Sequence, residues 1–226
     1  MEKTTREAQY SSCFDVRDRI GMQPLGIVTN LVWYEDPRHL LFMLARYKFV
    51  AKMLEGRDRV LEIGCGDGFA SRIVRQAVGA LTAVDFDPVF IEDAKSRVVD
   101  NWPIDYRVHD ILDGPVDGPF DAAYSIDVFE HIEQEKEDLF LNNVIANLTD
   151  DGVLVIGCPS LESQAYASPR SKEGHVNCKT GPELKACLEK HFSTVMMFSM
   201  NDEVVHTGFH KMAHYLYAIC SNKRDR

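Results

Sequence analysis

The sequence predicts an α/β domain built on a mostly parallel β-sheet with helices on both of its faces. From residue 59 onward, short apolar runs alternate with stretches of helical spacing, the usual order of elements in such sheets. A loop with glycine at positions 64, 66 and 68 directly follows the first apolar run. With 226 residues, 45% of them hydrophobic and 27% charged, the chain has the length and composition of one globular domain, 1–226.

The first regular element is expected to be a helix. Asp36-Pro37 has the form of an N-cap followed by proline at the first helical position, and apolar residues then recur every three or four positions through Leu54. Asp87-Pro88 repeats this signal before a later helix. After the first helix we expect strand 59–63, helix 69–78, strand 81–85, helix 88–101, strand 104–110, strand 121–126, helix 131–148 and strand 153–158.

The last third of the sequence changes pattern. Thr180-Gly-Pro-Glu183 matches a capping box, which predicts the start of a helix. The apolar stretches 193–200 and 213–220 follow with only a loop between them, which predicts an antiparallel closing pair at one end of the sheet. Residues 1–37 show no regular pattern but contain aromatic side chains, so we expect an irregular lid or cap segment before a core at 38–220.

Charge and composition narrow the classes of partner. The formal net charge of −10 argues against nucleic acid, because proteins that bind it carry a basic surface. No apolar run reaches the roughly 18 to 20 residues needed to cross a bilayer, so no membrane partner is expected. The N-terminus lacks the apolar segment of a secretion signal, which favours a cytoplasmic location. The six cysteines form no C-x-x-C pair and are expected to be reduced thiols.

The glycine loop indicates that a ligand approaches the backbone. A loop between a first strand and its helix lies at the ligand-binding edge of an open α/β sheet, and glycine removes the β-carbons that would hold a ligand away. A dinucleotide site would need G-x-G-x-x-G, but the third glycine position holds Phe69. The Gly-Lys-Ser/Thr of a phosphate loop and the Tyr-x-x-x-Lys pair of short-chain dehydrogenases are also missing. These absences disfavour a nicotinamide enzyme.

The spacing E-x-G-x-G-x-G at Glu62, Gly64, Gly66 and Gly68 resembles motif I of the class I S-adenosylmethionine-dependent methyltransferases. The resemblance covers roughly residues 38–220 and includes the carboxylates that follow the next two strands and the segment SIDVFEHI after the fourth. It implies a Rossmann-like fold with a seven-stranded, mostly parallel sheet, an antiparallel last strand and helices on both faces. It also implies S-adenosylmethionine as the cofactor, with S-adenosylhomocysteine as the product.

The resemblance further implies which residues hold the cofactor. Asp85 would accept hydrogen bonds from both ribose hydroxyls, and Asp110 would face the adenine amino group, with Phe86 and Ile111 against the ring. The backbone of Gly64, with Asp127 nearby, would face the methionyl end. Asp85 has an alternative role as a helix cap, although Asp87 already occupies that position, and Asp110 has an alternative role as a turn residue. The expected cofactor set is Glu62, Gly64, Gly66, Gly68, Asp85, Phe86, Asp110, Ile111 and Asp127.

Methyl transfer to a hydroxyl requires that its proton be removed, and a histidine is suited to that role. His175 follows the fifth strand and is the first candidate for the base, and His131 in FEHI is the second. His206, His210 and His214 have the i, i+4, i+8 spacing of ligands on a helix, but Gly208 argues against a helix there. Asp127 and Glu130 leave a magnesium-assisted reaction open, yet no full metal-ligand set can be named.

A small molecule is the expected methyl acceptor. The Asn- or Asp-Pro-Pro-Tyr of amino-methylating DNA enzymes and the Pro-Cys of cytosine enzymes are both missing. We expect an oxygen of a sugar, a nucleotide-linked sugar or a natural-product intermediate, with Trp33 and Tyr34 as apolar walls. A small-molecule N-methyltransferase and a non-catalytic cofactor-binding protein remain alternatives, an NAD-dependent enzyme is a weaker one, and a homodimer is left open.

Overall fold

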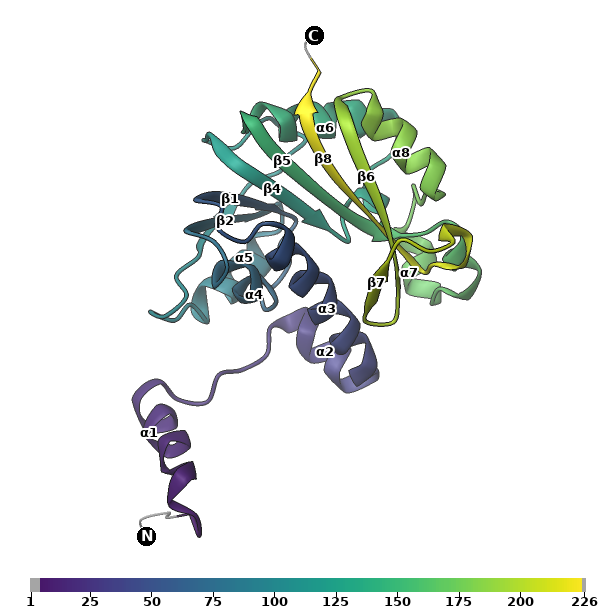
Figure 1. The fold of residues 1–226 in the computed structure, drawn as a ribbon. Coiled ribbons are helices and arrows are strands. Elements are labelled where there is room, and N and C mark those ends of the chain that lie inside the picture. The colour runs from purple at the N-terminus through teal and green to yellow at the C-terminus, as the bar shows by residue number, and fades with distance from the viewer. Residues whose placement is uncertain (1–4, 225–226) are drawn as a thin grey trace.

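The computed structural model describes residues 5–224, which are built around one eight-stranded β-sheet (Figure 1). The strand order is β3-β2-β1-β4-β5-β8-β6-β7. The strands are β1 Arg59–Ile63, β2 Ala80–Asp85, β3 Asp105–Val108, β4 Phe120–Ile126, β5 Leu148–Pro159, β6 Phe192–Asn201, β7 Val204–His206 and β8 Tyr215–Lys223. Strands β1 to β5 are parallel to one another, whereas β8 runs antiparallel between β5 and β6.

The predicted mostly parallel sheet with a reversed last strand is confirmed, but the number of strands is eight rather than seven. The additional strand is β7, three residues long, which pairs antiparallel with the end of β6. A turn at Asp202, whose φ is +51°, folds the connection between the two closing strands back onto the sheet edge. The antiparallel pair formed by β6 and β8 is present as predicted.

Helices cover both faces of the sheet and enclose two apolar clusters. On one face, α3, α4 and α5 bury residues such as Val50, Val74 and Ile91 against the strands. On the other face, α6 and α8 bury residues such as Phe140 and Leu184. The α-helices are α1 Ser11–Ile20, α2 Ile27–Glu35, α3 Pro37–Met53, α4 Ser71–Arg75, α5 Pro88–Ser96, α6 Glu137–Ala146, α7 Pro169–Gly174 and α8 Gly181–Glu189.

The three capping signals of the sequence begin helices where they were predicted. The Asp36 side chain accepts a hydrogen bond from the backbone N–H of Arg38, and Asp87 accepts one from Val89. Thr180 and Glu183 form the full capping box of α8. These contacts satisfy N–H groups that the first helical turn leaves unpaired. The helices predicted at 69–78, 88–101 and 131–148 are shorter, and the last begins only at Glu137, after two 3₁₀ turns.

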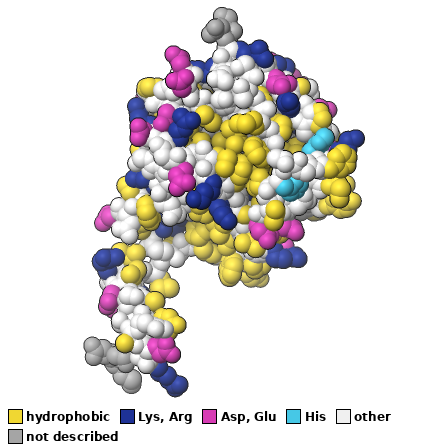
Figure 2. All heavy atoms as spheres, in the orientation of Figure 1, with side chains coloured by type: hydrophobic (Ala, Val, Ile, Leu, Met, Phe, Trp, Pro, Cys, Tyr) yellow, Lys and Arg dark blue, Asp and Glu magenta, His cyan; other side chains and the backbone are white. Residues whose placement is uncertain are grey.

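The N-terminal segment is helical, so the prediction of irregular structure there is wrong. Helix α1 has no buried residue and projects from the body, with hydrophobic and charged side chains on its surface (Figures 1 and 2). Helix α2 packs beside α3, and its first turn is hydrogen-bonded by side chains from later in the chain. The N–H and hydroxyl of Thr29 donate to Asp67 at 2.7 and 3.1 Å, and the N–H of Ile27 donates to Asp93 at 3.2 Å.

The cysteines and the hydropathy agree with the sequence analysis as far as the described residues go. All six cysteines are free thiols, four of them buried. Within residues 5–224, no helix combines the length and apolar character that crossing a bilayer requires.

Candidate active site

The carboxyl ends of β1 to β5 meet at one edge of the sheet because these strands are parallel. Chain order reverses between β1 and β4, and ligands of open α/β sheets bind in the crevice outside such a reversal. The loops after β1, β2, β3 and β4 carry the residues predicted to contact a cofactor, except Glu62, which lies within β1, and Asp85, which is the last residue of β2. The structure therefore brings the sequence-predicted cofactor residues to one edge.

The loop after β1 has the shape that its glycines require. Gly64, Gly66 and Gly68 have φ values of +74°, +52° and +64°, a region that side chains with a β-carbon rarely adopt. A β-carbon on Gly64 would lie 2.2 Å from Val128 Cγ2, so close packing also demands glycine there. A β-carbon on Gly66 would meet no atom within 4 Å. The backbone of Gly66 therefore faces open space.

Asp85 holds this loop and the following one together. Its Oδ2 accepts the N–H of Gly66 at 2.9 Å, and its Oδ1 accepts the N–H of Asp87 at 2.9 Å. Phe86 is 71% exposed, whereas Ile111 after β3 is buried. The Asp110 carboxylate accepts the N–H of Leu112 at 2.9 Å. The structure places these four side chains at the end of β2 or on the loops after the neighbouring strands β2 and β3, and their contacts with a cofactor stay predictions.

Glu62 is buried beneath the glycine loop. Its carboxylate accepts a hydrogen bond from the Tyr47 hydroxyl of α3 at 2.9 Å. Burial raises the pKa of Glu62 to about 7, and the neighbouring hydroxyls of Ser71, Tyr124 and Tyr47 limit this increase. The charge of Asp85 adds to the increase. Glu62 supports the loop from below, with almost no surface open to a ligand.

Asp127 joins the glycine-loop region to a cavity. It follows β4 directly and has a φ of +59°, unusual for a residue other than glycine. Its Oδ2 lies 2.6 Å from Nη1 of Arg46, whose guanidinium stacks 4.0 Å from the centre of the Tyr215 ring. Arg46 comes from α3, so this ion pair ties the loop after β4 to the helix that covers the sheet. Nothing in the local sequence of Arg46 signals this role.

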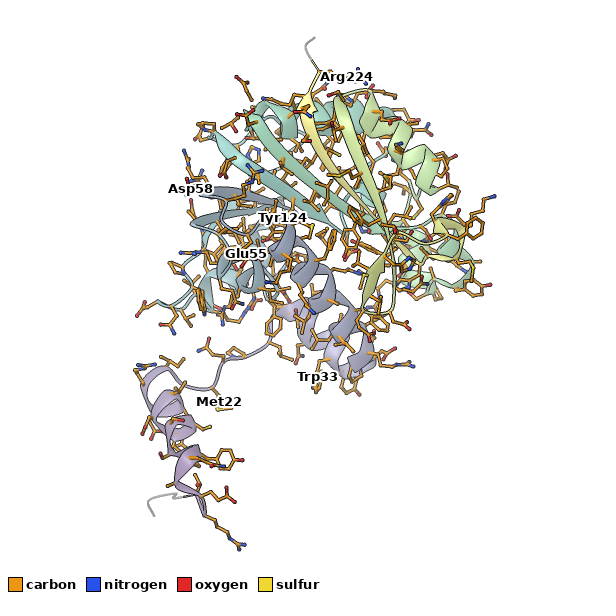
Figure 3. All side chains as sticks on the ribbon, in the orientation of Figure 1. Met22, Trp33, Glu55, Asp58, Tyr124 and Arg224 are labelled. Atoms are coloured by element: carbon orange, nitrogen blue, oxygen red, sulfur yellow. The ribbon has the colours of Figure 1, made fainter. Side chains whose placement is uncertain are left out.

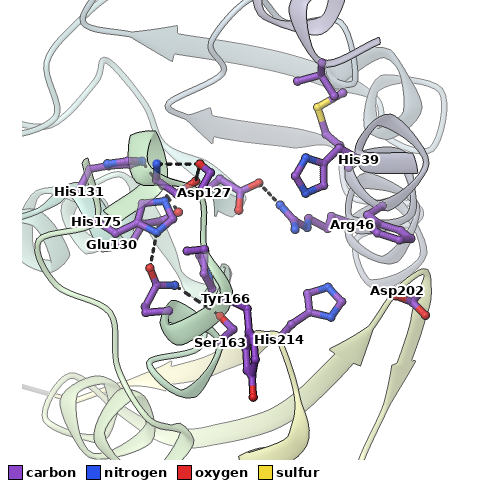
Figure 4. A pocket seen from close by; sticks show the side chains of 18 of the residues that line it. His39, Arg46, Asp127, Glu130, His131, Ser163, Tyr166, His175, Asp202 and His214 are labelled. Carbon is purple, nitrogen blue, oxygen red and sulfur yellow. Dashed lines mark hydrogen bonds and ion pairs between the residues drawn. The ribbon is translucent and has the colours of Figure 1, made fainter. Parts of the chain in front are cut away.

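The cavity has a volume of about 530 Å³ and opens beside Asp127 (Figure 4). Its walls come from α2, α3, the loop after β4, the long connection after β5 and the residues near β8. Helix α2 contributes Val28 and Val32. Trp33 and Tyr34, the predicted walls, are 53% and 85% exposed and are not among the lining residues (Figure 3).

Three potential ligating side chains meet on one wall of the cavity: Glu130, His131 and His175. One oxygen or nitrogen atom from each lies within 4.8 Å of the other two. The rings of the two histidines are 5.2 Å apart between centroids. The two candidate bases of the sequence analysis are therefore neighbours, although 44 positions separate them in the chain.

Glu130 is the least expected member of this group. Its side chain is 1% exposed, and among residues 5–224 neither carboxylate oxygen has a hydrogen-bond partner. Burial, and then the negative charge of Asp127, raise the pKa of Glu130 well above its ordinary value. Burial and the neighbouring His131 lower the pKa of His175. In the sequence, this group was indicated only by the adjacent residues Glu130 and His131.

The other histidine set does not come together. His206 lies in β7 and bonds Asn201 at 2.8 Å, His210 lies in a 3₁₀ turn against Gly181, and His214 lines the cavity. The expectation that no helix carries these three residues is confirmed.

Comparison with known proteins identifies the central part of the chain. A family model described as a methyltransferase domain matches residues 60–152, from β1 into β5. Residues 60–152 are therefore similar to a methyltransferase domain. The sheet order, with the reversed strand β8, belongs to the class I fold of these proteins.

Individual relatives of the methyltransferase domain are distant. The mitochondrial ubiquinone biosynthesis O-methyltransferase of Schizosaccharomyces pombe is 32% identical over 121 residues, which cover 49% of this chain and 43% of that protein. The chain spans about half the length of the curated relatives it matches.

Solved structures match over more of the chain. The N-methyltransferase NodS from Bradyrhizobium japonicum WM9, in complex with S-adenosyl-L-homocysteine, has a TM-score of 0.60 at 20% identity, covering 96% of this chain and 99% of NodS. The DhpI-SAM-HEP complex has a TM-score of 0.61 at 18% identity, covering 96% and 99%. At these identities the likeness establishes the fold alone.

Proposed function

We propose that this protein is an S-adenosylmethionine-dependent methyltransferase that methylates an oxygen of a small molecule. The observation that carries the proposal is the continuity between two features at the carboxyl edge of the sheet. The glycine loop presents open backbone at Gly66, and Asp127 links that region to the 530 Å³ cavity. A donor on one side and an acceptor on the other could thus meet at Asp127.

The residues at the edge fit the cofactor. S-adenosylmethionine, when bound, supplies an electrophilic methyl group, and transfer to an oxygen breaks the carbon–sulfur bond, leaves its electron pair on sulfur and releases the acceptor's proton. Asp85 can accept hydrogen bonds from ribose hydroxyls because a carboxylate has about four lone-pair sites and the two backbone N–H groups occupy only some of them. Exposed Phe86 and buried Ile111 offer apolar surface for a purine. The nine cofactor residues predicted from the sequence remain our assignment.

The cavity fits a small acceptor. Its volume lies within the roughly 300 to 1,000 Å³ typical of small-molecule sites. Most of its lining side chains are polar or ionisable, and apolar side chains from α2 and α3 complete the walls. A positioned acceptor is the main requirement of an in-line displacement. Oxygen is favoured over nitrogen because Glu130, His131 and His175 on the cavity wall can prepare a hydroxyl for attack. The net charge of −10 supports a small molecule over nucleic acid.

The test is incubation of the full chain with methyl-labelled S-adenosylmethionine and a metabolite extract, followed by identification of the labelled product. We expect label on an oxygen of a small molecule, and none with an Asp85→Ala variant at low cofactor concentration. Label on nitrogen would overturn the choice of acceptor atom. Cofactor binding without any labelled product would overturn the enzymatic assignment and favour a non-catalytic binding protein.

A further inference from the structure

Glu130 poses a physical problem that the methyltransferase fold does not solve. An ionised carboxylate buried without a partner is strongly unfavourable, and buried charges in proteins are paired or bind metals. Arg46, the nearest buried cation in the site, is already bound to Asp127 at 2.6 Å. The free partners beside Glu130 are two imidazoles.

We propose that Glu130, His131 and His175 bind one divalent transition-metal ion on the wall of the cavity. The metal would act in the methyl transfer, so this role rests on the proposed function, but the binding itself does not. Two histidines and one glutamate are a known set for catalytic zinc, in which three protein ligands leave a position open. Here the open position would face the cavity, where an acceptor oxygen could occupy it.

The hydrogen bonds of both histidines suit metal binding. His131 Nδ1 lies 2.7 Å from the carbonyl oxygen of Gly174, and His175 Nδ1 lies 2.9 Å from Oε1 of Gln164. Because these partners are acceptors, each Nδ1 carries the hydrogen and each Nε2 has a free lone pair. Metal-ligating histidines are usually held in this way by a carbonyl or carboxylate.

The orientation of Gln164 supports this assignment. Its amide nitrogen donates to the carbonyl oxygen of Ser160 at 3.3 Å and contacts the Ser163 hydroxyl at 3.4 Å. These contacts fix the amide oxygen on the side of His175. Gln164 is thus a positioning residue for the His175 imidazole.

The distances require only a small contraction. His131 Nε2 lies 4.0 Å from Oε1 of Glu130, and all three ligand atoms lie within 4.8 Å of one another. Some point then lies no more than about 2.8 Å from each atom, whereas zinc bonds to nitrogen and oxygen are about 2.0 to 2.2 Å long. Each side chain would move inward by well under about 1 Å, which rotamer adjustment supplies.

Metal binding would replace the base role predicted for His175. With both imidazoles bound through Nε2, neither is free to accept the acceptor's proton. A hydroxyl bound to a divalent cation has a lowered pKa and releases its proton to water instead. The oxygen then attacks the methyl carbon as described above.

The direct test is metal binding by the full-length protein after removal of metals with a chelator. Titration calorimetry with Zn²⁺ and the visible absorption of added Co²⁺ should each give one site per chain. Gln164→Ala removes a hydrogen-bond partner of a ligand and should weaken Zn²⁺ binding by roughly 10- to 100-fold. Glu130→Gln and His175→Asn remove a ligand itself and should weaken Zn²⁺ binding by more than this. His39→Gln is the matched control, because His39 lines the same cavity outside the cluster.

The outcomes separate this inference from the proposed function. Unchanged Zn²⁺ affinity in both ligand variants would overturn the metal site. Full methyl transfer by metal-free protein would overturn the catalytic role of the metal and return the base role to a histidine. Since glutamine has nearly the same shape as the buried Glu130 side chain, we expect Glu130→Gln to fold, and circular dichroism of both variants checks this. One Zn²⁺ per chain without methyl transfer to any acceptor would leave the site standing and reject the proposed function.

Discussion

Replacing Glu62 with glutamine should remove a defined part of the pH dependence of folding stability. The Glu62 carboxylate is buried under the glycine loop, and burial raises its pKa to about 7, compared with 4.5 for an unperturbed glutamate. Glutamine has nearly the same shape and can still accept the Tyr47 hydrogen bond. It carries no charge at any pH, so only the titration is lost.

The sign and size of the effect follow from the two pKa values. Below pH 4.5, Glu62 is protonated in both the folded and the unfolded state. Between pH 4.5 and 7 the folded state keeps a proton that the unfolded state has released, so stability falls as pH rises through this window. With these values, the free energy of unfolding of the wild type should fall by about 2.5 kcal/mol relative to Glu62→Gln between pH 5 and pH 8.

Urea unfolding at several pH values between 5 and 8 measures this difference. Glu92→Gln, on the exposed side of α5, is the control for removing one carboxylate. A difference between wild type and Glu62→Gln that stays constant within about 0.5 kcal/mol across the range would refute the assignment of a raised pKa to Glu62.

Three further results are expected. Asp85→Ala should weaken binding of S-adenosylhomocysteine by about 10- to 150-fold, or 1.5 to 3 kcal/mol, in calorimetry; unchanged affinity in a folded variant would remove Asp85 from the site. Gly66→Ala and Gly56→Ala should each cost about 1 kcal/mol of stability, because both have positive φ and open space, but only Gly66→Ala should also weaken cofactor binding. Deleting 1–35 should abolish turnover more than cofactor binding, whereas deleting 1–21 should spare both; equal activity of the two truncations would refute a lid role for α2.

The sheet could be predicted from the sequence because its signals are local. Strand β1 and the glycine loop occupy consecutive residues, and the caps at Asp36, Asp87 and Thr180 depend on neighbours two or three positions away. Helix α2 was missed for the opposite reason. Its β-branched, apolar sequence has weak helical preference, and the contacts that hold its first turn come from Asp67 and Asp93, far along the chain.

The candidate site shows the same difference between local sequence signals and contacts of residues far apart in the chain. That the proposed cofactor residues gather at one edge could be predicted, because most of them end or follow a strand whose end is visible in the sequence. The grouping of Glu130 with His131 and His175 depends on how the connection after β5 folds back over the loop after β4, and no local pattern encodes that. The pairing of Arg46 with Asp127 likewise exists only in three dimensions.

Asp67 lies within the glycine loop and also bonds the first turn of α2, so one carboxylate connects this loop to a helix that forms a wall of the cavity. A β-carbon on Gly26, just before α2, would come within 2.2 Å of that carboxylate, which shows how closely the two segments touch. Any change in the loop when a cofactor arrives must therefore shift α2 or break these bonds. A single side chain therefore couples the conformation of the glycine loop to the position of one cavity wall.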